Sequence, residues 1–148
     1  MSIKLDIGIE SFPIEFSNGK KAEIHFNPND PDLAVRLKRF RDNAPKRIAE
    51  IEDVEIGNDG KPTIEQGVEA IERFEKIQNI MCEELDKAFG SEISSEVFKY
   101  CSPFALVKGE RFVVRFMEAM LPEIQKRMEK ANEKRADIQK KYLSKYKK

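Results

Sequence analysis

The first 26 residues of the chain alternate between apolar and polar positions, which is typical of strands that bury one face. Three runs of apolar residues at every second position carry this pattern: Ile3, Leu5, Ile7 and Ile9; Phe12, Ile14 and Phe16; Ala22, Ile24 and Phe26. Between the second and third runs, Asn18-Gly19 favours a type I′ turn, because both central residues of that turn need positive φ. We therefore expect an antiparallel β-hairpin of two or three strands within residues 1–27.

At Pro31 the spacing of apolar residues changes from two to three or four, the period of an amphipathic helix. Asp30 can cap the first turn of this helix, and Pro31 suits the first helical position because an N–H there would have no partner. Pro45 then interrupts the apolar stripe. The helix is therefore expected either to end near Asn43 or to continue beyond a kink.

A second helix is predicted from the capping-box spacing of Thr63 and Gln66. Its apolar stripe comprises Ile64, Val68, Ile71, Phe74, Ile77 or Gln78, Met81, Leu85 and Phe89. Gly90 follows this stripe and is expected to take the left-handed conformation that ends many helices. A shorter helix around Ser94 to Tyr100 and a break at Ser102-Pro103 come next.

A last helix is predicted over Glu110 to Lys145, with Pro122 either at a kink or in the first turn of a new helix. Eight of its residues, separated alternately by four and three positions, form a seam: Met117, Leu121, Ile124, Met128, Ala131, Arg135, Ile138 and Tyr142. This spacing matches the a and d positions of a coiled coil, which face a neighbouring helix.

The seam weakens toward its C-terminal end, because Ala131 is small and Arg135 is charged. The outer part is therefore too weak to form a coiled coil by itself. We expect Phe112 to Met128 to pack on the helix that contains Ile71 to Phe89, and the remainder to project as a charged helix. A projecting helix with a half-apolar seam requires a partner to cover it.

Together these patterns predict an α+β fold, in which an N-terminal β-hairpin or small antiparallel sheet precedes a mainly α-helical bundle with a long C-terminal helix. The 148 residues suit a single domain with one core. We divide this domain into a β-hairpin region (1–27), a helical body (31–128) and a basic helical tail (129–148).

The formal charge of the chain is zero, with 27 basic and 27 acidic residues, but the charges are unevenly placed. Residues 123–148 contain ten Lys or Arg and four Asp or Glu, which leaves 17 against 23 for the rest. The basic end is compatible with nucleic-acid binding, which we keep as the alternative function. Nucleic acid is not the expected partner, because the chain lacks a recognition motif, Lys outnumbers Arg in its tail and its body is acidic.

We find no constellation of residues that would carry chemistry. The single histidine, His25, lies on a predicted strand without a metal-binding or nucleophilic partner. Cys82 and Cys101 fall in segments predicted to be helical, lack the spacing of a redox or zinc motif, and are expected to be reduced, buried thiols. We therefore expect no catalytic, cofactor-binding or metal-binding residues, no cofactor and no enzymatic activity. With no leader and no apolar run of membrane length, the chain is expected to be soluble, intracellular and without a membrane partner.

Several short phrases of the sequence resemble the small tail assembly chaperones of long-tailed phages and prophages of Gram-positive bacteria. The resemblance covers most of the chain. It rests on the Phe-rich hairpin, the Pro-capped helix and three segments: Leu85-Asp86-Lys87-Ala88-Phe89-Gly90, Glu96-Val97-Phe98 and Phe116-Met117-Glu118-Ala119-Met120-Leu121-Pro122-Glu123-Ile124.

The resemblance implies a non-enzymatic chaperone that binds the long helical tape-measure protein, helps to recruit tail-tube subunits and self-associates. It also implies a location in the cytoplasm of the bacterial host and absence from the mature virion. We expect partners to bind at the hairpin and the last helix, through Phe12, Phe16, Phe26, Met117, Leu121, Ile124, Met128, Ile138 and Tyr142.

Overall fold

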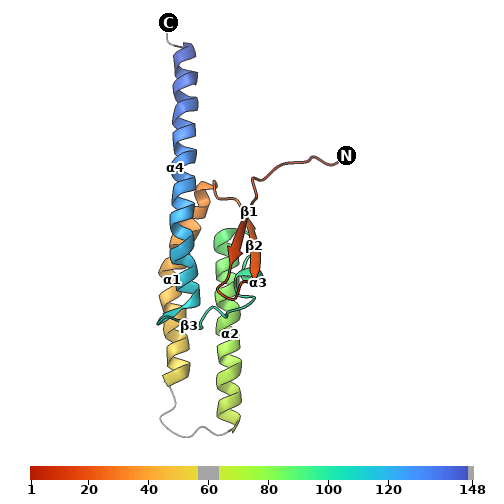
Figure 1. The fold of residues 1–148 in the computed structure, drawn as a ribbon, viewed down its shortest axis with the longest axis vertical. Coiled ribbons are helices and arrows are strands. Elements are labelled where there is room, and N and C mark those ends of the chain that lie inside the picture. The colour runs from red at the N-terminus through yellow and green to blue at the C-terminus, as the bar shows by residue number, and fades with distance from the viewer. Residues whose placement is uncertain (57–63, 147–148) are drawn as a thin grey trace.

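The computed structural model describes residues 1–56 and 64–146. Its elements are, in chain order, β1 (Glu10–Glu15), β2 (Lys21–Phe26), α1 (Pro31–Ile56), α2 (Ile64–Phe89), α3 (Ser94–Val97), β3 (Leu106–Val107), β4 (Glu110–Arg111) and α4 (Phe112–Tyr146) (Figure 1). A two-stranded antiparallel sheet is thus followed by helices, of which the last is the longest, and the expected α+β fold is confirmed. Thr63, the first residue of the predicted capping box, lies outside the described residues.

β1 and β2 form the expected hairpin, with Glu10 opposite Phe26 and Glu15 opposite Lys21. Its turn differs from the prediction. Among the described non-glycine residues only Lys108 has a positive φ, so Asn18 cannot belong to a type I′ turn. The Phe16 N–H instead donates to the Lys20 carbonyl at 2.9 Å, and Gly19 alone takes the left-handed conformation (φ 82°), as in hairpins with three-residue loops.

The third strand that the alternation allowed is not present. Residues 1–9 belong to no strand and extend away from the body (Figure 1). The apolar face of β2, by contrast, is fully used, since Ala22, Ile24 and Phe26 are buried. The hairpin therefore joins the core mainly through β2.

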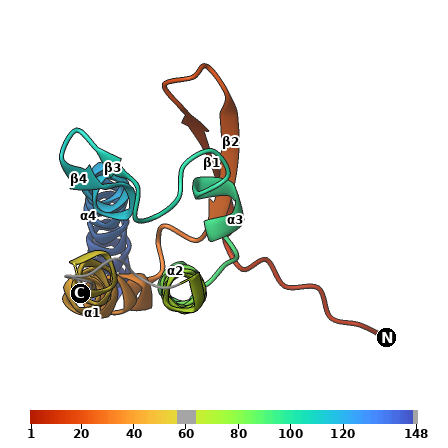
Figure 2. The ribbon, with the colours of Figure 1, turned by 90° about the horizontal axis from the view of Figure 1, so that it is seen from below.

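α1 begins as its sequence predicts, with the Asp30 carboxylate accepting the Asp32 N–H at 3.0 Å. The helix continues through Pro45 to Ile56, so the alternative end near Asn43 is wrong. α2 lies beside α1 (Figures 1 and 2). The Arg36 guanidinium links the two helices by donating to the Ala88 carbonyl at 2.9 Å.

α2 ends at the predicted position. The Ser91 N–H donates to the Asp86 carbonyl at 3.1 Å and the Gly90 N–H to the Lys87 carbonyl at 3.3 Å, while Gly90 has φ 70°. This is the Schellman arrangement, which requires a left-handed residue after the helix.

The segment between α2 and α4 differs most from the sequence prediction. α3 contains only four residues, and Cys101 lies after it rather than within a helix. The short strands β3 and β4 were not predicted. They are joined by Lys108 and Gly109, whose φ values of 52° and 84° give the two-residue turn that an antiparallel pair needs.

α4 starts at Phe112, slightly later than predicted, and runs through Pro122 without interruption. It lies along α1 (Figure 2), although the sequence analysis placed it on α2. Its contact with α2 is made where Phe116 meets Phe89, with ring centroids 5.9 Å apart. Phe89 also packs edge-on against Phe26 at 5.0 Å, so three aromatic rings connect the hairpin, α2 and α4.

Candidate partner-binding surface

The predicted seam of α4 divides into a buried part and an exposed part. Met117 and Ile124 are 7% and 4% exposed, whereas Ile138 and Tyr142 are 66% and 62% exposed. The change occurs after Met128, and from Asn132 to Lys145 every side chain is exposed. We call residues 129–146 the projecting segment, because this part of α4 extends past the other helices (Figure 1).

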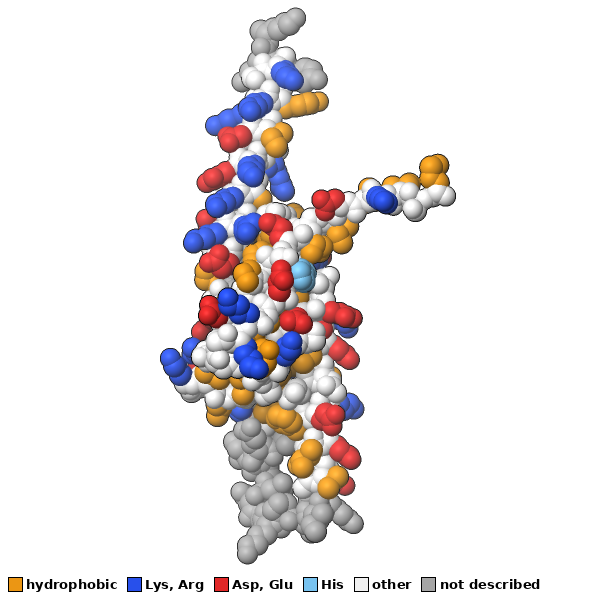
Figure 3. All heavy atoms as spheres, turned by 45° about the vertical axis from the view of Figure 1, so that its right-hand side comes forward, with side chains coloured by type: hydrophobic (Ala, Val, Ile, Leu, Met, Phe, Trp, Pro, Cys, Tyr) orange, Lys and Arg blue, Asp and Glu red, His pale blue; other side chains and the backbone are white. Residues whose placement is uncertain are grey.

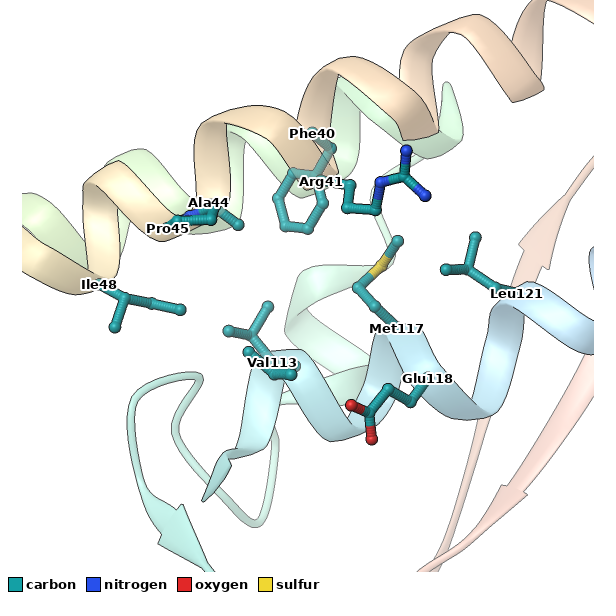
Figure 4. A pocket seen from close by; sticks show the side chains of 10 residues that line it. Phe40, Arg41, Ala44, Pro45, Ile48, Val113, Met117, Glu118 and Leu121 are labelled. Atoms are coloured by element: carbon teal, nitrogen blue, oxygen red, sulfur yellow. The ribbon is translucent and has the colours of Figure 1, made fainter. Parts of the chain in front are cut away.

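The buried part of the seam borders a shallow apolar groove between α1 and α4. In Figure 4, Phe40 and Ala44 of α1 face Val113 and Met117 of α4. The groove has a volume of about 240 Å³, and its wall is continued by other apolar side chains, among them Pro45, Ile48, Val114 and Leu121. It can accept a small apolar side chain but is too small for a helix.

A second groove continues along the same two helices. It has a volume of about 350 Å³ and lies between Ala34 and Leu37 of α1 and Leu121, Ile124 and Met128 of α4. Four of the nine predicted partner-binding residues (Met117, Leu121, Ile124 and Met128) thus lie in the α1–α4 contact. Their first role is to pack the body.

A larger hollow lies farther out, between residues 6–10 and residues 127–139 of α4. Its volume is about 730 Å³ and it is open to solvent. Ala131 and Ile138 of the seam line it, together with Ile9. At its inner end Arg127 pairs with Glu10 at 2.9 Å.

Basic side chains line the α4 wall of this outer groove, and Asp6 and Glu10 lie on its opposite wall. Lys130, Lys134 and Arg135 line it, and further Lys side chains follow along the projecting segment, where apolar side chains are visible between them (Figure 3). Apolar positions next to Lys and Arg suit a helical partner with an apolar stripe and acidic flanks.

The three aromatic residues predicted on the hairpin have different surroundings. Phe26 is fully buried and leaves no surface for a partner. Phe12 is half-buried, stacked on Phe26 at 4.6 Å and covered by the Arg127 guanidinium at 5.4 Å. Phe16 is half-buried against Tyr100, with ring centroids 5.2 Å apart.

Two exposed apolar surfaces were not among the predicted site residues. One consists of Ile3, Leu5, Ile7 and Ile9, and the other of Val68 and Ile71 on α2. Both occur in runs that the sequence analysis assigned to a buried strand or a buried helical face. Periodicity identifies which residues share a face, but it does not show whether another element covers that face.

Among residues 1–56 and 64–146, no three His, Cys, Asp or Glu residues are grouped closely enough to hold a metal ion. His25 is exposed, and its Nδ1 lies 3.0 Å from the Ser11 hydroxyl. Cys82 and Cys101 are free thiols that are half-buried rather than buried, and burial raises the pKa of each.

Comparison of the chain with models of protein families, with curated protein sequences and with solved structures finds no match. None of the helices in the described part of the chain combines the length and apolarity that crossing a bilayer requires.

Proposed function

We propose that this protein is a non-enzymatic assembly chaperone that binds a long helical partner along the projecting segment of α4. The single observation behind this proposal is the exposure of Ile138 and Tyr142 on a helix that extends beyond its own core. Exposed apolar side chains in helical register are a common docking surface for an amphipathic helix.

The charges of the projecting segment define the expected partner. It carries six basic residues (Lys130, Lys134, Arg135, Lys140, Lys141 and Lys145) and three acidic ones (Glu129, Glu133 and Asp137). A partner helix with apolar residues at three- and four-residue spacing and with Asp or Glu beside them would complement both properties. The rate of association should then fall as salt screens the charges.

The resemblance in the sequence supplies the identity that we propose for this partner, a phage tape-measure protein. A tape-measure protein is long and helical, and a chaperone with an exposed helical seam would keep it soluble before the tail tube forms. In this proposal tail-tube subunits are recruited to the complex, the protein acts in the cytoplasm of the bacterial host, and it is absent from the finished virion.

The proposal is tested by co-expression with a tape-measure protein, sought as the product of a very long gene near this one, and measurement of the soluble complex. Replacing both seam residues in the Ile138→Asp/Tyr142→Asp variant should abolish co-purification and leave the tape-measure protein insoluble. The matched control is Ala136→Asp/Ser144→Asp, which adds the same two charges on the opposite face of the helix.

Binding by the control but not by the seam variant would support the proposal. Equal binding by both variants, or no complex with the unmodified protein, would overturn it. The unfolding temperature of each variant should match that of the unmodified protein, since none of the four side chains is in the core.

The basic α4 wall of the outer groove favours one alternative, an accessory or regulatory protein that binds nucleic acid. That function predicts binding to DNA or RNA at low salt, with a steep loss as salt rises. It also predicts that deletion of the residues after Asn132 removes binding. Absence of a mobility shift at low salt would dismiss the alternative.

A further inference from the structure

The segment formed by Ile3, Leu5, Ile7 and Ile9 has the sequence of a strand but no strand beside it. The exposed fractions of these side chains are 86%, 81%, 69% and 44%. The segment extends from the body as an arm (Figure 3), and the Asn27 side-chain amide holds its base by donating to the Ile7 carbonyl at 3.0 Å. We call residues 3–9 the arm.

The arm cannot pair along its length with the strand that follows it. β1 starts at Glu10, directly after the arm, whereas an antiparallel return needs at least two residues of turn. A turn would consume the last residues of the arm and remove them from the pairing. We therefore look for the complementary strand edge on another molecule.

β1 offers such an edge. Phe12 and Ile14 of β1, and Phe16 directly after it, are only half-buried, although Ala22, Ile24 and Phe26 on the paired strand β2 are buried. Cover is thus missing on the β1 side of the sheet. The next strand of a sheet would supply it.

The backbone of β1 is also available for pairing on this side. Along an antiparallel pair of strands, hydrogen-bonded residue pairs alternate with non-hydrogen-bonded ones. The Phe16 N–H donates to the Lys20 carbonyl, so Phe16 and Lys20 form a hydrogen-bonded pair, and the pairs next to it along the strands follow in alternation. In this alternation Ser11, Pro13 and Glu15 belong to the non-hydrogen-bonded pairs, so their backbone groups point away from β2. Pro13 has no N–H, so it suits the outer edge and leaves the N–H groups of the other two residues as donors.

We propose that two copies of this protein exchange arms, and that the arm of each copy adds an antiparallel strand to the β1 edge of the other. Placing Ile7 opposite Phe12 puts Leu5 opposite Ile14. The same register puts Ile3 opposite Phe16, so the three apolar pairs lie on one face.

Charge supports this register. On the opposite face of the added strand, Lys4 lies opposite Glu15, and no charged residue lies opposite another of its own sign. Gly8, with φ 73°, interrupts the extended backbone near the end of the arm, two residues before β1. This break allows the apolar residues to change from odd positions in the arm to even positions in β1.

The exchange is reciprocal, because each copy has one arm and one open β1 edge. We place it in a closed two-fold dimer, because both halves of the exchange then follow the same register. The occupant is a second copy of this chain rather than an unrelated strand, since the arm and the edge match in apolar spacing and in charge. This inference does not rest on the identity of the partner bound by the projecting segment, although Ile9 of the arm and Ile138 of that segment border the same outer groove.

The test measures the mass of the full chain by analytical ultracentrifugation over a range of concentrations. The unmodified protein should reach the mass of a dimer, and Leu5→Asp should remain a monomer at every concentration, because the charge would enter the apolar face of the new strand. Ser2→Asp is the matched control and should dimerise normally.

Charge reversal then tests the register. Lys4→Glu and Glu15→Lys should each weaken the dimer about fivefold, and the two changes combined in one chain should restore it. Lys76→Glu on α2 is the control for net charge and should have no effect.

Cross-linking gives an independent measurement, in a background that carries Cys82→Ser and Cys101→Ser. A mixture of Leu5→Cys and Ile14→Cys chains should form a disulfide-linked dimer on oxidation, whereas Asp6→Cys, on the other face of the arm, should not link to Ile14→Cys. A monomeric unmodified protein, undiminished dimerisation of Leu5→Asp, or equal cross-linking by both cysteine pairs would each overturn the inference. None of these outcomes depends on binding to a tape-measure protein.

Discussion

Asp86 organises the chain where it leaves α2. One oxygen of its carboxylate accepts the N–H groups of Ile93 and Ser94 at 2.9 and 2.7 Å, and the other accepts the Ser94 hydroxyl at 2.8 Å. Because Ile93 is fully buried, water cannot replace the lost acceptor at that N–H.

Asp86→Ala should therefore lower the free energy of unfolding by about 1 to 3 kcal/mol, measured by urea denaturation. Asp86→Asn, which keeps one oxygen acceptor, should lose less. Glu83→Ala, at an exposed position of the same helix, should have almost no effect. An equal loss in all three variants would show that Asp86 has no special role.

Cys82 makes stability depend on pH in the alkaline range. Burial raises the pKa of its thiol, and the negative charges of Asp86 and Glu83 raise it further. The folded protein therefore keeps the thiol protonated where the unfolded chain ionises it, above an ordinary value of about 8.5. Its contribution to stability is complete below that pH and is lost as the pH rises toward the folded-state pKa.

We expect the free energy of unfolding to decrease with pH above about 8.5, and to decrease less in Cys82→Ser. Subtracting the two pH profiles removes the titration of Lys and Tyr residues that both proteins share. Identical profiles would contradict the assignment to Cys82.

At the scale of the elements, Pro45 is the residue least suited to its position. It lies inside α1, where a proline cannot donate to the carbonyl four residues earlier, and its side chain is exposed. Pro45→Ala should raise the free energy of unfolding by about 1 to 3 kcal/mol, because it restores a hydrogen bond and removes little packing. Chemical denaturation measures the change.

Ala49, one turn further along the same helix and also exposed, provides the control. Ala49→Pro should destabilise the protein by about 3 kcal/mol. A Pro45→Ala variant that is less stable than the unmodified protein would show that α1 depends on the geometry imposed by the proline.

The projecting segment should be the least stable part of α4. It packs on no core, and several of its charged pairs at four-residue spacing repel each other, including Lys130 with Lys134 and Glu133 with Asp137. Its backbone amides should exchange hydrogen much faster than those from Phe112 to Met128. Mass spectrometry of deuterated fragments measures this, and equal protection along α4 would contradict it.

The elements differ in how far their sequences predict them. The last residue of α2 is predicted correctly, because the apolar stripe and Gly90 are both features of the local sequence. The β3–β4 hairpin is missed because two-residue strands have no periodicity and Lys108-Gly109 is not one of the strong hairpin dipeptides. The arm was assigned to a strand because alternation reports a shared face and not the presence of a neighbour.

For the candidate partner-binding surface, too, the spacing of apolar residues predicts less than the structure shows. The seam from Met117 to Tyr142 has one continuous spacing, and only the weakness at Ala131 and Arg135 indicated where burial ends. The choice of α1 over α2 as the neighbour of α4 depends on how three helices pack in space, which the spacing within one helix does not specify. Likewise, Phe26 and Phe12 share a pattern but differ in exposure because β2 lies deeper than β1.

At the scale of the whole molecule, α4 determines the shape. Its 35 residues extend about 52 Å at 1.5 Å per residue. A compact chain of 148 residues has a radius of gyration of about 15 Å, and we expect a clearly larger value by X-ray scattering from the Leu5→Asp variant, which should be monomeric. Truncation of that variant after Lys130 should bring the value toward 15 Å; an unchanged radius would mean that α4 does not project.

The division of α4 into a buried part and a projecting segment also bears on how the protein can change over generations. Substitutions at Met117 or Ile124 alter the core and are constrained by folding. Substitutions at Ile138 or Tyr142 change only what the outer surface presents. If the projecting segment binds as proposed, its partner preference can change while the body stays the same, so descendants of this chain can come to bind different partners on a common scaffold.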